Sequence, residues 1–301
     1  MKKIVLLGLA VAMLSVLIIG CAPSKPALGT ADNPIVMSFV PSGDTQEIIS
    51  GGDEIAKLLS DKTGLAVKAN VATSFSAVIE AMGTGKAQIG WLNTFGYILA
   101  HEKYGVDVIL VTVRFGTPYY KGQIIVQADS GIKTLKDLKG KTFCWVDPAS
   151  TSGYVIPRVM FQAAGIDPDK DFKQTTEAGS HNNVVLAVYK GDCDGGATYV
   201  DARGTIEKDF PDVKDKIAVI AESPEIPNDT VSVSKSLPPE MRDKIKSALL
   251  EIAGTDEGKA ALKTVYEIEG LIDKDDTFYD PFRQTLDAAG VNVADLSKPK
   301  E

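Results

Sequence analysis

The stretch DPASTSGY at residues 147–154 joins an apolar run at 142–146 to a pattern typical of a helix. Three consecutive hydroxyl residues, at 150–152, stand directly before Gly153, where that helix is expected to begin. The first N–H groups of a helix have no partner within it, and the helix dipole adds partial positive charge there. Hydroxyl groups either donate to an anion or cap the helix by accepting from these N–H groups. The stretch therefore predicts an anion site or, alternatively, an ordinary helix cap.

Short apolar runs alternate with helical patterns on both sides of this stretch, which is typical of parallel α/β units. We expect strands at residues 35–40, 66–71, 88–92, 108–113, 122–128, 142–146, 172–176, 195–200, 217–221 and 230–234. We expect helices at residues 47–63, 74–83, 94–104, 152–164, 182–189, 203–209, 238–253, 256–267 and 281–289.

The strands form two series, and the chain passes between them near Tyr119 and again near Asp229. This order predicts one lobe from residues 34–118 with 230–301 and a second lobe from residues 119–229. Open α/β sheets bind ligands beyond the carboxyl ends of their strands. We therefore expect the ligand in the cleft between the lobes.

Pro157 falls in the second turn of the helix expected after the hydroxyl stretch. A proline there has no N–H to donate and leaves the carbonyl of Gly153 without its helical partner. Pro157 therefore predicts one of two features. Either the helix has a tolerated kink, or its first turn is tilted so that its N–H groups point at a ligand and not along the helix axis.

The N-terminus has the composition of an export signal. Lys2-Lys3 precedes an apolar run at 4–19 that is shorter than a membrane span requires, followed by Gly20-Cys21. Residues 18–21 resemble the bacterial lipobox, which implies removal of residues 1–20 and lipid on Cys21; a retained anchor helix is the alternative. Residues 21–33 are rich in Pro, Ala, Ser and Gly and are expected to be a tether.

Two further cysteines remain, Cys144 in an expected strand and Cys193 in the turn before another. An exported protein can form disulfides, so these two are expected either to pair or to be a buried thiol and a loop residue.

The chain is acidic, with a formal charge of −8 that becomes −10 when Lys2 and Lys3 are removed with the signal. An acidic surface without basic clusters argues against nucleic acid as a partner, and it requires any anion to be held by local dipoles. No P-loop spacing and no metal-ligand spacing is present in the sequence. We expect neither a metal nor a cofactor.

Several motifs together resemble the phosphate/phosphite/phosphonate solute-binding proteins of ABC importers. They are DLKGK at 137–141, DPASTSG at 147–153, VPS at 40–42, GSH at 179–181 and SPEIPND at 223–229. The resemblance extends from about residue 35 to residue 246, and the STSG and GSH motifs are its most specific parts.

The resemblance implies a type II periplasmic-binding-protein fold, in which each lobe is a mixed, mostly parallel sheet flanked by helices and two crossing strands form the hinge. It implies a monomeric, non-enzymatic lipoprotein outside the cytoplasm, held to the membrane by Cys21, that delivers its ligand to an ABC permease. The implied ligand is phosphite, phosphate or a short alkylphosphonate such as methylphosphonate, and the sequence does not choose among them.

Nine positions are expected to bind the ligand, six of them because of the resemblance. Ser150, Thr151 and Ser152 match the oxyanion turn, His181 matches the family histidine, Asp229 matches an aspartate at the crossing strand, and Asp201 stands where relatives often have a glutamate. Ser42, Tyr97 and Tyr120 complete the expected site. Helix capping for His181, surface positions for both aspartates and hinge packing for Tyr120 are the alternatives.

One position departs from the family pattern. Relatives that take aminoethylphosphonate have tyrosine after the tryptophan of the third strand, whereas Leu92 follows Trp91 here. This difference favours methylphosphonate and phosphite as ligands, although Tyr97 or Tyr120 is available as a substitute ring.

Carboxylates beside an oxyanion repel it unless the ligand donates a hydrogen bond to them. We therefore expect Asp201 and Asp229 to face a P–OH group or a ligand ammonium. Two other functions remain possible from the sequence. A receptor that reports the same ligands to a membrane sensor would need the same residues, and Ser152, His181 and Asp201 have the residue types of a hydrolase, although no G-x-S-x-G motif is present.

Overall fold

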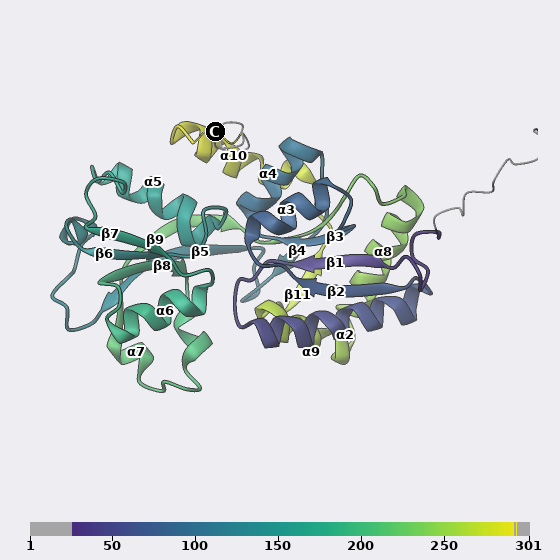
Figure 1. The fold of residues 1–301 in the computed structure, drawn as a ribbon, viewed down its shortest axis with the longest axis horizontal. Coiled ribbons are helices and arrows are strands. Elements are labelled where there is room, and N and C mark those ends of the chain that lie inside the picture. The colour runs from purple at the N-terminus through teal and green to yellow at the C-terminus, as the bar shows by residue number, and fades with distance from the viewer. Residues whose placement is uncertain (1–25, 292, 294–301) are drawn as a thin grey trace, which may run out of the picture.

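The computed structural model describes residues 26–291 and 293, which fold into two sheets, each covered by helices (Figure 1). The expected export signal, the lipid site at Cys21 and the first part of the tether lie outside these residues. Within them, no helix is both long and apolar enough to span a membrane.

The first lobe is a six-stranded sheet in the order β11-β4-β10-β3-β1-β2. Its strands are β1 (Ile35–Phe39), β2 (Val67–Val71), β3 (Ile89–Leu92), β4 (Asp107–Val113), β10 (Thr230–Val233) and β11 (Gly270–Ile272). Its helices are α2 (Thr45–Thr63), α3 (Phe75–Gly83), α4 (Thr94–Tyr104), α8 (Pro239–Ile252) and α9 (Asp256–Tyr266). Strands β1, β2 and β3 are parallel, and β10 runs antiparallel between β3 and β4.

The second lobe is a five-stranded sheet in the order β7-β6-β8-β5-β9. Its strands are β5 (Tyr119–Gln127), β6 (Thr142–Trp145), β7 (Gln174–Glu177), β8 (Gly195–Tyr199) and β9 (Ile217–Pro227). Helix α5 (Ile156–Ala163) lies on one side of this sheet, and α6 (His181–Lys190) and α7 (Val213–Lys216) lie on the other (Figure 1). Strand β5 alone runs against the others, so both sheets are mixed with most strands in one direction.

The chain passes between the lobes twice, from β4 to β5 and from β9 to β10. The two crossings lie side by side, because the N–H of Asn228 donates to the carbonyl of Pro118 at 2.8 Å. The N–H of Thr112 donates to the carbonyl of Asp229 at 2.9 Å. The crossings are thus held together at the base of the cleft.

Aromatic packing fixes the strand and the helix that flank the hydroxyl turn. Phe143 and Trp145 of β6 lie 5.2 and 6.1 Å from the ring of Phe161 on α5, and Phe143 stacks on Phe172 at 4.9 Å. All four rings are buried, and each such pair contributes about 0.5–1.5 kcal/mol beyond its buried area. The turn between β6 and α5 is therefore anchored at both ends.

Cys144 and Cys193 form a disulfide that joins β6 to the turn before β8. The two positions meet because β6 and β8 are neighbours in the sheet. Closing a loop of this size stabilises a fold by about 2–4 kcal/mol.

The structure also departs from the sequence expectations. Strand β9 continues to Pro227, beyond the expected end at residue 221. Proline usually ends a strand because it lacks an N–H, but β9 is an edge strand and needs no donor on its outer side. Strand β11 and helix α7 were not expected, since three or four residues give too short a pattern to detect.

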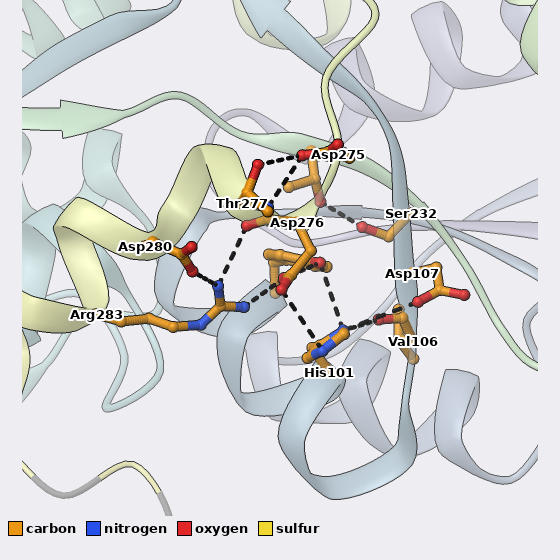
Figure 2. A network of polar contacts seen from close by, with 11 residues as sticks. His101, Val106, Asp107, Ser232, Asp275, Asp276, Thr277, Asp280 and Arg283 are labelled. Atoms are coloured by element: carbon orange, nitrogen blue, oxygen red, sulfur yellow. Dashed lines mark hydrogen bonds and ion pairs between the residues drawn. The ribbon is translucent and has the colours of Figure 1, made fainter.

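The C-terminal segment fastens to both crossings. It consists of a short 3₁₀ helix, Asp276–Tyr279, followed by α10 (Asp280–Ala288). The hydroxyl of Tyr279 donates to the carbonyl of Asn228 at 2.9 Å, and the ring of Phe278 lies 5.3 Å from that of Tyr119. Figure 2 shows how Asp276 anchors this segment by contacting Arg283 and lying near His101 of α4.

Candidate functional site

The hydroxyl turn begins with a wide helical turn, Thr151–Val155, in which the N–H of Val155 donates to the carbonyl of Ser150, five residues earlier. The hydroxyl of Ser150 accepts from the N–H of Gly153 at 3.2 Å. Ser150 is thus a helix cap, as one of the two sequence interpretations had it. The hydroxyls of Thr151 and Ser152 make no such capping bond.

Pro157 is the second residue of α5, so it acts at the junction between the wide turn and the regular helix. The carbonyl of Gly153, which this proline leaves without a helical partner, accepts instead from the N–H of Val146 at 3.1 Å. A Cβ atom on Gly153 would lie 2.3 Å from Cγ2 of Val146. The turn is therefore folded back against the preceding strand, and only glycine leaves room for that contact.

Thr151 connects the turn to the first lobe. Its hydroxyl oxygen accepts from Nδ2 of Asn93 at 2.8 Å and from the N–H of Phe95 at 2.9 Å. Asn93 also donates to the carbonyl of Ala149 at 2.8 Å. Because its oxygen accepts twice, the hydroxyl of Thr151 faces other partners only as a donor.

Ser152, within the turn, lies close to Tyr120 of β5. Ser152 is buried, and the hydroxyl of Tyr120 is close to those of Ser152, Thr151 and Thr94. Burial raises the pKa of Tyr120, and the negative charge of Asp229 raises it further. Tyr120 is therefore a neutral hydroxyl that can donate a hydrogen bond.

His181, the first residue of α6, forms a second contact between the lobes. Its N–H donates to the carbonyl of Ser42 at 3.0 Å, and its Nδ1 lies 2.8 Å from the hydroxyl of Thr198. Burial lowers the pKa of His181 to about 3, and the charge of Arg114 acts in the same direction. The ring is thus neutral at physiological pH, and Nε2–H is the donor if Nδ1 accepts from Thr198.

Asp229 lies at the second crossing, directly before β10, and is partly buried. Burial raises the pKa of its carboxyl group to about 6, although the positive charge of Arg114 opposes that shift. Asp229 is therefore mostly ionised at neutral pH and becomes protonated in mild acid.

Arg114 follows β4 at the first crossing and was not predicted from the sequence. Its side chain is buried, with Nη2 3.4 Å from Oε2 of Glu267 and the guanidinium 4.7 Å above the ring of Tyr199. No motif surrounds it. The signal in the sequence was indirect: a carboxylate such as Asp229, if buried beside an anion, needs a cation nearby to remain charged.

A cavity of about 730 Å³ lies between the lobes and has Ser42, Arg114, Tyr199, Asp229 and Tyr266 among its lining residues. The remaining lining residues are Gly43, Asp44, Glu47, Gly204, Thr205, Lys208, Asp209, Ala260, Lys263, Thr264, Val265 and Glu267. The cleft therefore leads from an exposed, charged mouth to Asp229 and Arg114.

Of the nine expected residues, only Ser42 and Asp229 line this cavity. The hydroxyl turn and His181 are buried where the lobes meet, Tyr120 is half-buried there, and the remaining two residues lie elsewhere. Asp201 is exposed, lines neither this cavity nor the smaller one beside Tyr120, and has a left-handed backbone with φ 68°. The hydroxyl of Tyr97 donates to Asp276 of the C-terminal segment at 2.6 Å, so its ring does not substitute for the one absent at Leu92. Of the two carboxylates, the structure brings only Asp229 to the cleft.

The hydrolase alternative finds no support in this geometry. Nδ1 of His181 contacts Thr198, and Asp201 is exposed, so Ser152, His181 and Asp201 do not form a triad. Among residues 26–291 and 293, no group of three or more His, Cys, Asp or Glu side chains is arranged to hold a metal ion.

Comparison with known proteins identifies the family. A sequence profile described as "ABC transporter, phosphonate, periplasmic substrate-binding protein" matches residues 37–279. The chain belongs to this family. Its members bind their ligands outside the cytoplasm and are not enzymes, and each works with a membrane permease.

Individual members of the family are similar over most of their length. The Phosphate-import protein PhnD of Mycolicibacterium smegmatis is 27% identical, over 93% of this chain and 95% of that protein. The binding protein component of an ABC phosphonate transporter from Pseudomonas aeruginosa is 27% identical with a TM-score of 0.79, over 89% and 90% of the two chains.

A second solved structure shares the fold. PhnD1 from Prochlorococcus marinus in complex with methylphosphonate is 18% identical with a TM-score of 0.76, over 86% of this chain and 98% of that one. These similarities establish the type II periplasmic-binding-protein fold expected from the sequence.

Proposed function

We propose that this phosphonate-family binding protein captures a small phosphorus oxyanion in the cleft and delivers it to an ABC permease. The ligands we propose are phosphite, phosphate and short alkylphosphonates such as methylphosphonate. The observation that carries the proposal is the buried Thr151-Ser152 turn at the start of α5, which lies where the two lobes meet.

The donors around this turn suit a tetrahedral anion. The hydroxyls of Thr151 and Ser152, the first N–H groups of the helical turn, the hydroxyl of Tyr120 and the neutral imidazole of His181 are all able to donate. An oxyanion accepts several such bonds at once, and charge-assisted bonds are about twice as strong as neutral ones. Ser42, whose carbonyl already holds His181, lies at the opposite wall.

Asp229 narrows the choice of ligand. An ionised carboxylate in the cleft repels a phosphodianion, but it accepts a hydrogen bond from a P–OH group. We therefore propose that the ligand binds as a monoanion. Leu92 is fully buried in the first lobe and offers no ring for an aminoethyl group, which ranks methylphosphonate and phosphite above aminoethylphosphonate.

Export and lipid attachment remain part of the proposal. The sequence Gly20-Cys21 after an apolar run supports anchoring through lipid on Cys21, and we propose that the anchored protein acts as a monomer. Mass spectrometry of the membrane-bound protein would show a diacylglycerol-modified Cys21, and a Cys21→Ser variant should be released. A sensor rather than a permease as partner would fit the same site, and loss of uptake in a strain lacking the protein separates the two.

Titration calorimetry tests the ligand class directly. The purified protein should bind methylphosphonate, phosphite or phosphate and show no heat with sulfate, an amino acid or a sugar. If one of these other compounds binds and none of the phosphorus species does, the proposal is wrong.

A further inference from the structure

We propose that Arg114 is a specificity-determining residue of this site: its positive charge keeps Asp229 ionised, so the cleft accepts oxyanions that carry a proton and rejects those without one. The inference rests on the proposed function, because it assigns the residue that separates phosphonates from sulfonates of the same shape.

The position of Arg114 supports this role. The residue comes directly after β4 at the first crossing, and only 6% of it is exposed. Its guanidinium lies 4.7 Å above the ring of Tyr199. The ring centres of Tyr199 and His181 are 4.7 Å apart, in an edge-to-face arrangement. Arg114, Tyr199 and His181 thus form a row of contacts that extends from the first crossing to the proposed anion-binding residues of the second lobe.

The charge of Arg114 is only loosely paired. Its nearest carboxylate, Glu267, lies at 3.4 Å and is 54% exposed, and Nε is buried without a hydrogen-bond partner. A buried guanidinium that lacks a close bidentate partner exerts its charge on other groups around it. Asp229 is such a group, because its own carbonyl is held by Thr112, two residues before Arg114, and both side chains line the cavity.

Among the titratable groups around Arg114 and Asp229 that the structure describes, Arg114 is the buried cation, because the others are either neutral or exposed. His181 is neutral, and burial raises the pKa of the surrounding tyrosines, so they are neutral as well; these are Tyr120, Tyr199, Tyr266 and Tyr279. The remaining charged groups at the cavity are exposed to solvent, which screens them; these are Asp44, Glu47, Lys208, Asp209, Lys263 and Glu267.

Selection follows from the ionised state of Asp229. Methylphosphonate as a monoanion has a P–OH group that donates to the carboxylate, whereas methanesulfonate has the same shape and charge but no proton. The sulfonate therefore meets an unpaired like charge. Without Arg114, burial would keep Asp229 protonated at neutral pH, and the neutral carboxyl group would donate to either ligand.

Titration calorimetry with methylphosphonate and methanesulfonate from pH 5 to pH 9 tests the inference on the wild type, Arg114→Gln, Arg114→Lys and Asp229→Asn. The wild type should prefer the phosphonate strongly at pH 7 and begin to accept the sulfonate only as the pH falls through about 6, the pKa of Asp229. In Arg114→Gln, the pH below which the sulfonate binds should be higher than in the wild type. The ratio of phosphonate to sulfonate affinity at pH 7 should fall by about tenfold to a hundredfold.

The other variants separate charge from structure. Arg114→Lys retains the charge on a shorter side chain, so the pH at which sulfonate binding begins should rise less than in Arg114→Gln. In Asp229→Asn, sulfonate binding should not depend on pH in this range, because residue 229 no longer titrates. Thermal unfolding checks that each variant is folded. If Arg114→Gln is not, Arg114→Met removes the charge with a side chain of similar length, and an onset of sulfonate binding there at the wild-type pH contradicts the inference.

Two failures can be distinguished. A wild type that binds neither ligand, nor phosphite or phosphate, overturns the proposed function. A wild type that binds methylphosphonate, with Arg114→Gln retaining the same onset and the same preference, overturns only the role of Arg114.

Discussion

The proposed site combines two regions that would hold the ligand by different means. On the second lobe, Thr151, Ser152 and His181, here called the neutral wall, present hydroxyl, N–H and neutral imidazole donors. None of these groups changes charge near neutral pH. At the crossings, Arg114 and Asp229 present full charges of opposite sign, and the carboxyl group titrates at about pH 6.

This difference assigns two tasks to two regions. In the proposed site, fixed dipoles and hydroxyls would determine where an oxyanion lies, and they act at any pH at which the fold is stable. Arg114 and Asp229 would determine which protonation state of the ligand is accepted. Changes on the neutral wall should therefore lower affinity equally at all pH values, whereas changes at the crossings should alter the pH dependence.

The largest expected effect comes from breaking the neutral wall with Gly153→Ala. The added methyl group would lie 2.3 Å from Val146 and displace the whole turn, so affinity for methylphosphonate should fall by about a hundredfold or more. Calorimetry at pH 6 and pH 8 should show the same loss. Gly270→Ala is the matched control, because the nearest atom to its added Cβ lies 4.0 Å away; an equal loss there would contradict the explanation.

A smaller effect is expected when one donor is removed from the neutral wall. Ser152→Ala deletes a hydroxyl but leaves the backbone donors, and a charged hydrogen bond contributes about 1.5–3 kcal/mol. Affinity should fall about tenfold to a hundredfold, as measured by calorimetry. If the Ser150, Thr151 and Ser152 single variants all bind as the wild type does, the stretch is only a helix cap.

Asp229→Asn should change the pH profile more than the affinity. In the wild type, affinity should fall as the pH rises through the ligand's own last ionisation, because the dianion loses its P–OH donor. The amide both donates and accepts, so the variant should bind with a flatter profile. A wild type that binds equally well on both sides of that ionisation would remove Asp229 from the discrimination.

The same variant has a predictable effect on folding. The pKa of Asp229 is raised in the folded state, so ionising it costs folding free energy above about pH 6 and nothing below its unfolded pKa of about 4. Asp229→Asn should therefore raise the free energy of unfolding by about 3 kcal/mol at pH 8 and leave it nearly unchanged at pH 4. Urea unfolding of the ligand-free protein at both pH values measures this difference.

The smallest effect on affinity is expected from removing the disulfide. Replacing Cys144 and Cys193 with serine should lower the free energy of unfolding by about 2–4 kcal/mol, since the unfolded chain regains freedom. Affinity should change less than threefold, because neither cysteine lines the cavity. A large loss of binding at a temperature where the variant is folded would show that the bond positions the turn.

The sequence located those elements of the proposed site that carry a local signal. The hydroxyl turn, the proline after it and the histidine at the start of α6 each stand in a motif with a recognisable strand or helix around it. The two crossings were also predictable, because the order of strands and helices changes near Tyr119 and Asp229.

What the sequence did not predict depends on distant segments meeting. Arg114 has no motif, and it matters because Tyr199, Asp229 and Glu267 surround it in the fold. Asp201 stands at the right interval after His181, yet its exposed position excludes it from the cavity. Sequence spacing fixes the distance along the chain, and only the packing of β8 and the following 3₁₀ helix decides where such a side chain lies.

The attachment of the C-terminal segment to both crossings has a mechanical consequence. A bend at the crossings must either carry α10 along or break the bond from Tyr279 to the carbonyl of Asn228 and the contact of Phe278 with Tyr119. Any such bend would therefore move the last helix, although that helix takes no part in lining the cavity. If ligand capture bends the crossings, an environment-sensitive dye on the exposed face of α10 would report it as an optical signal without touching the ligand.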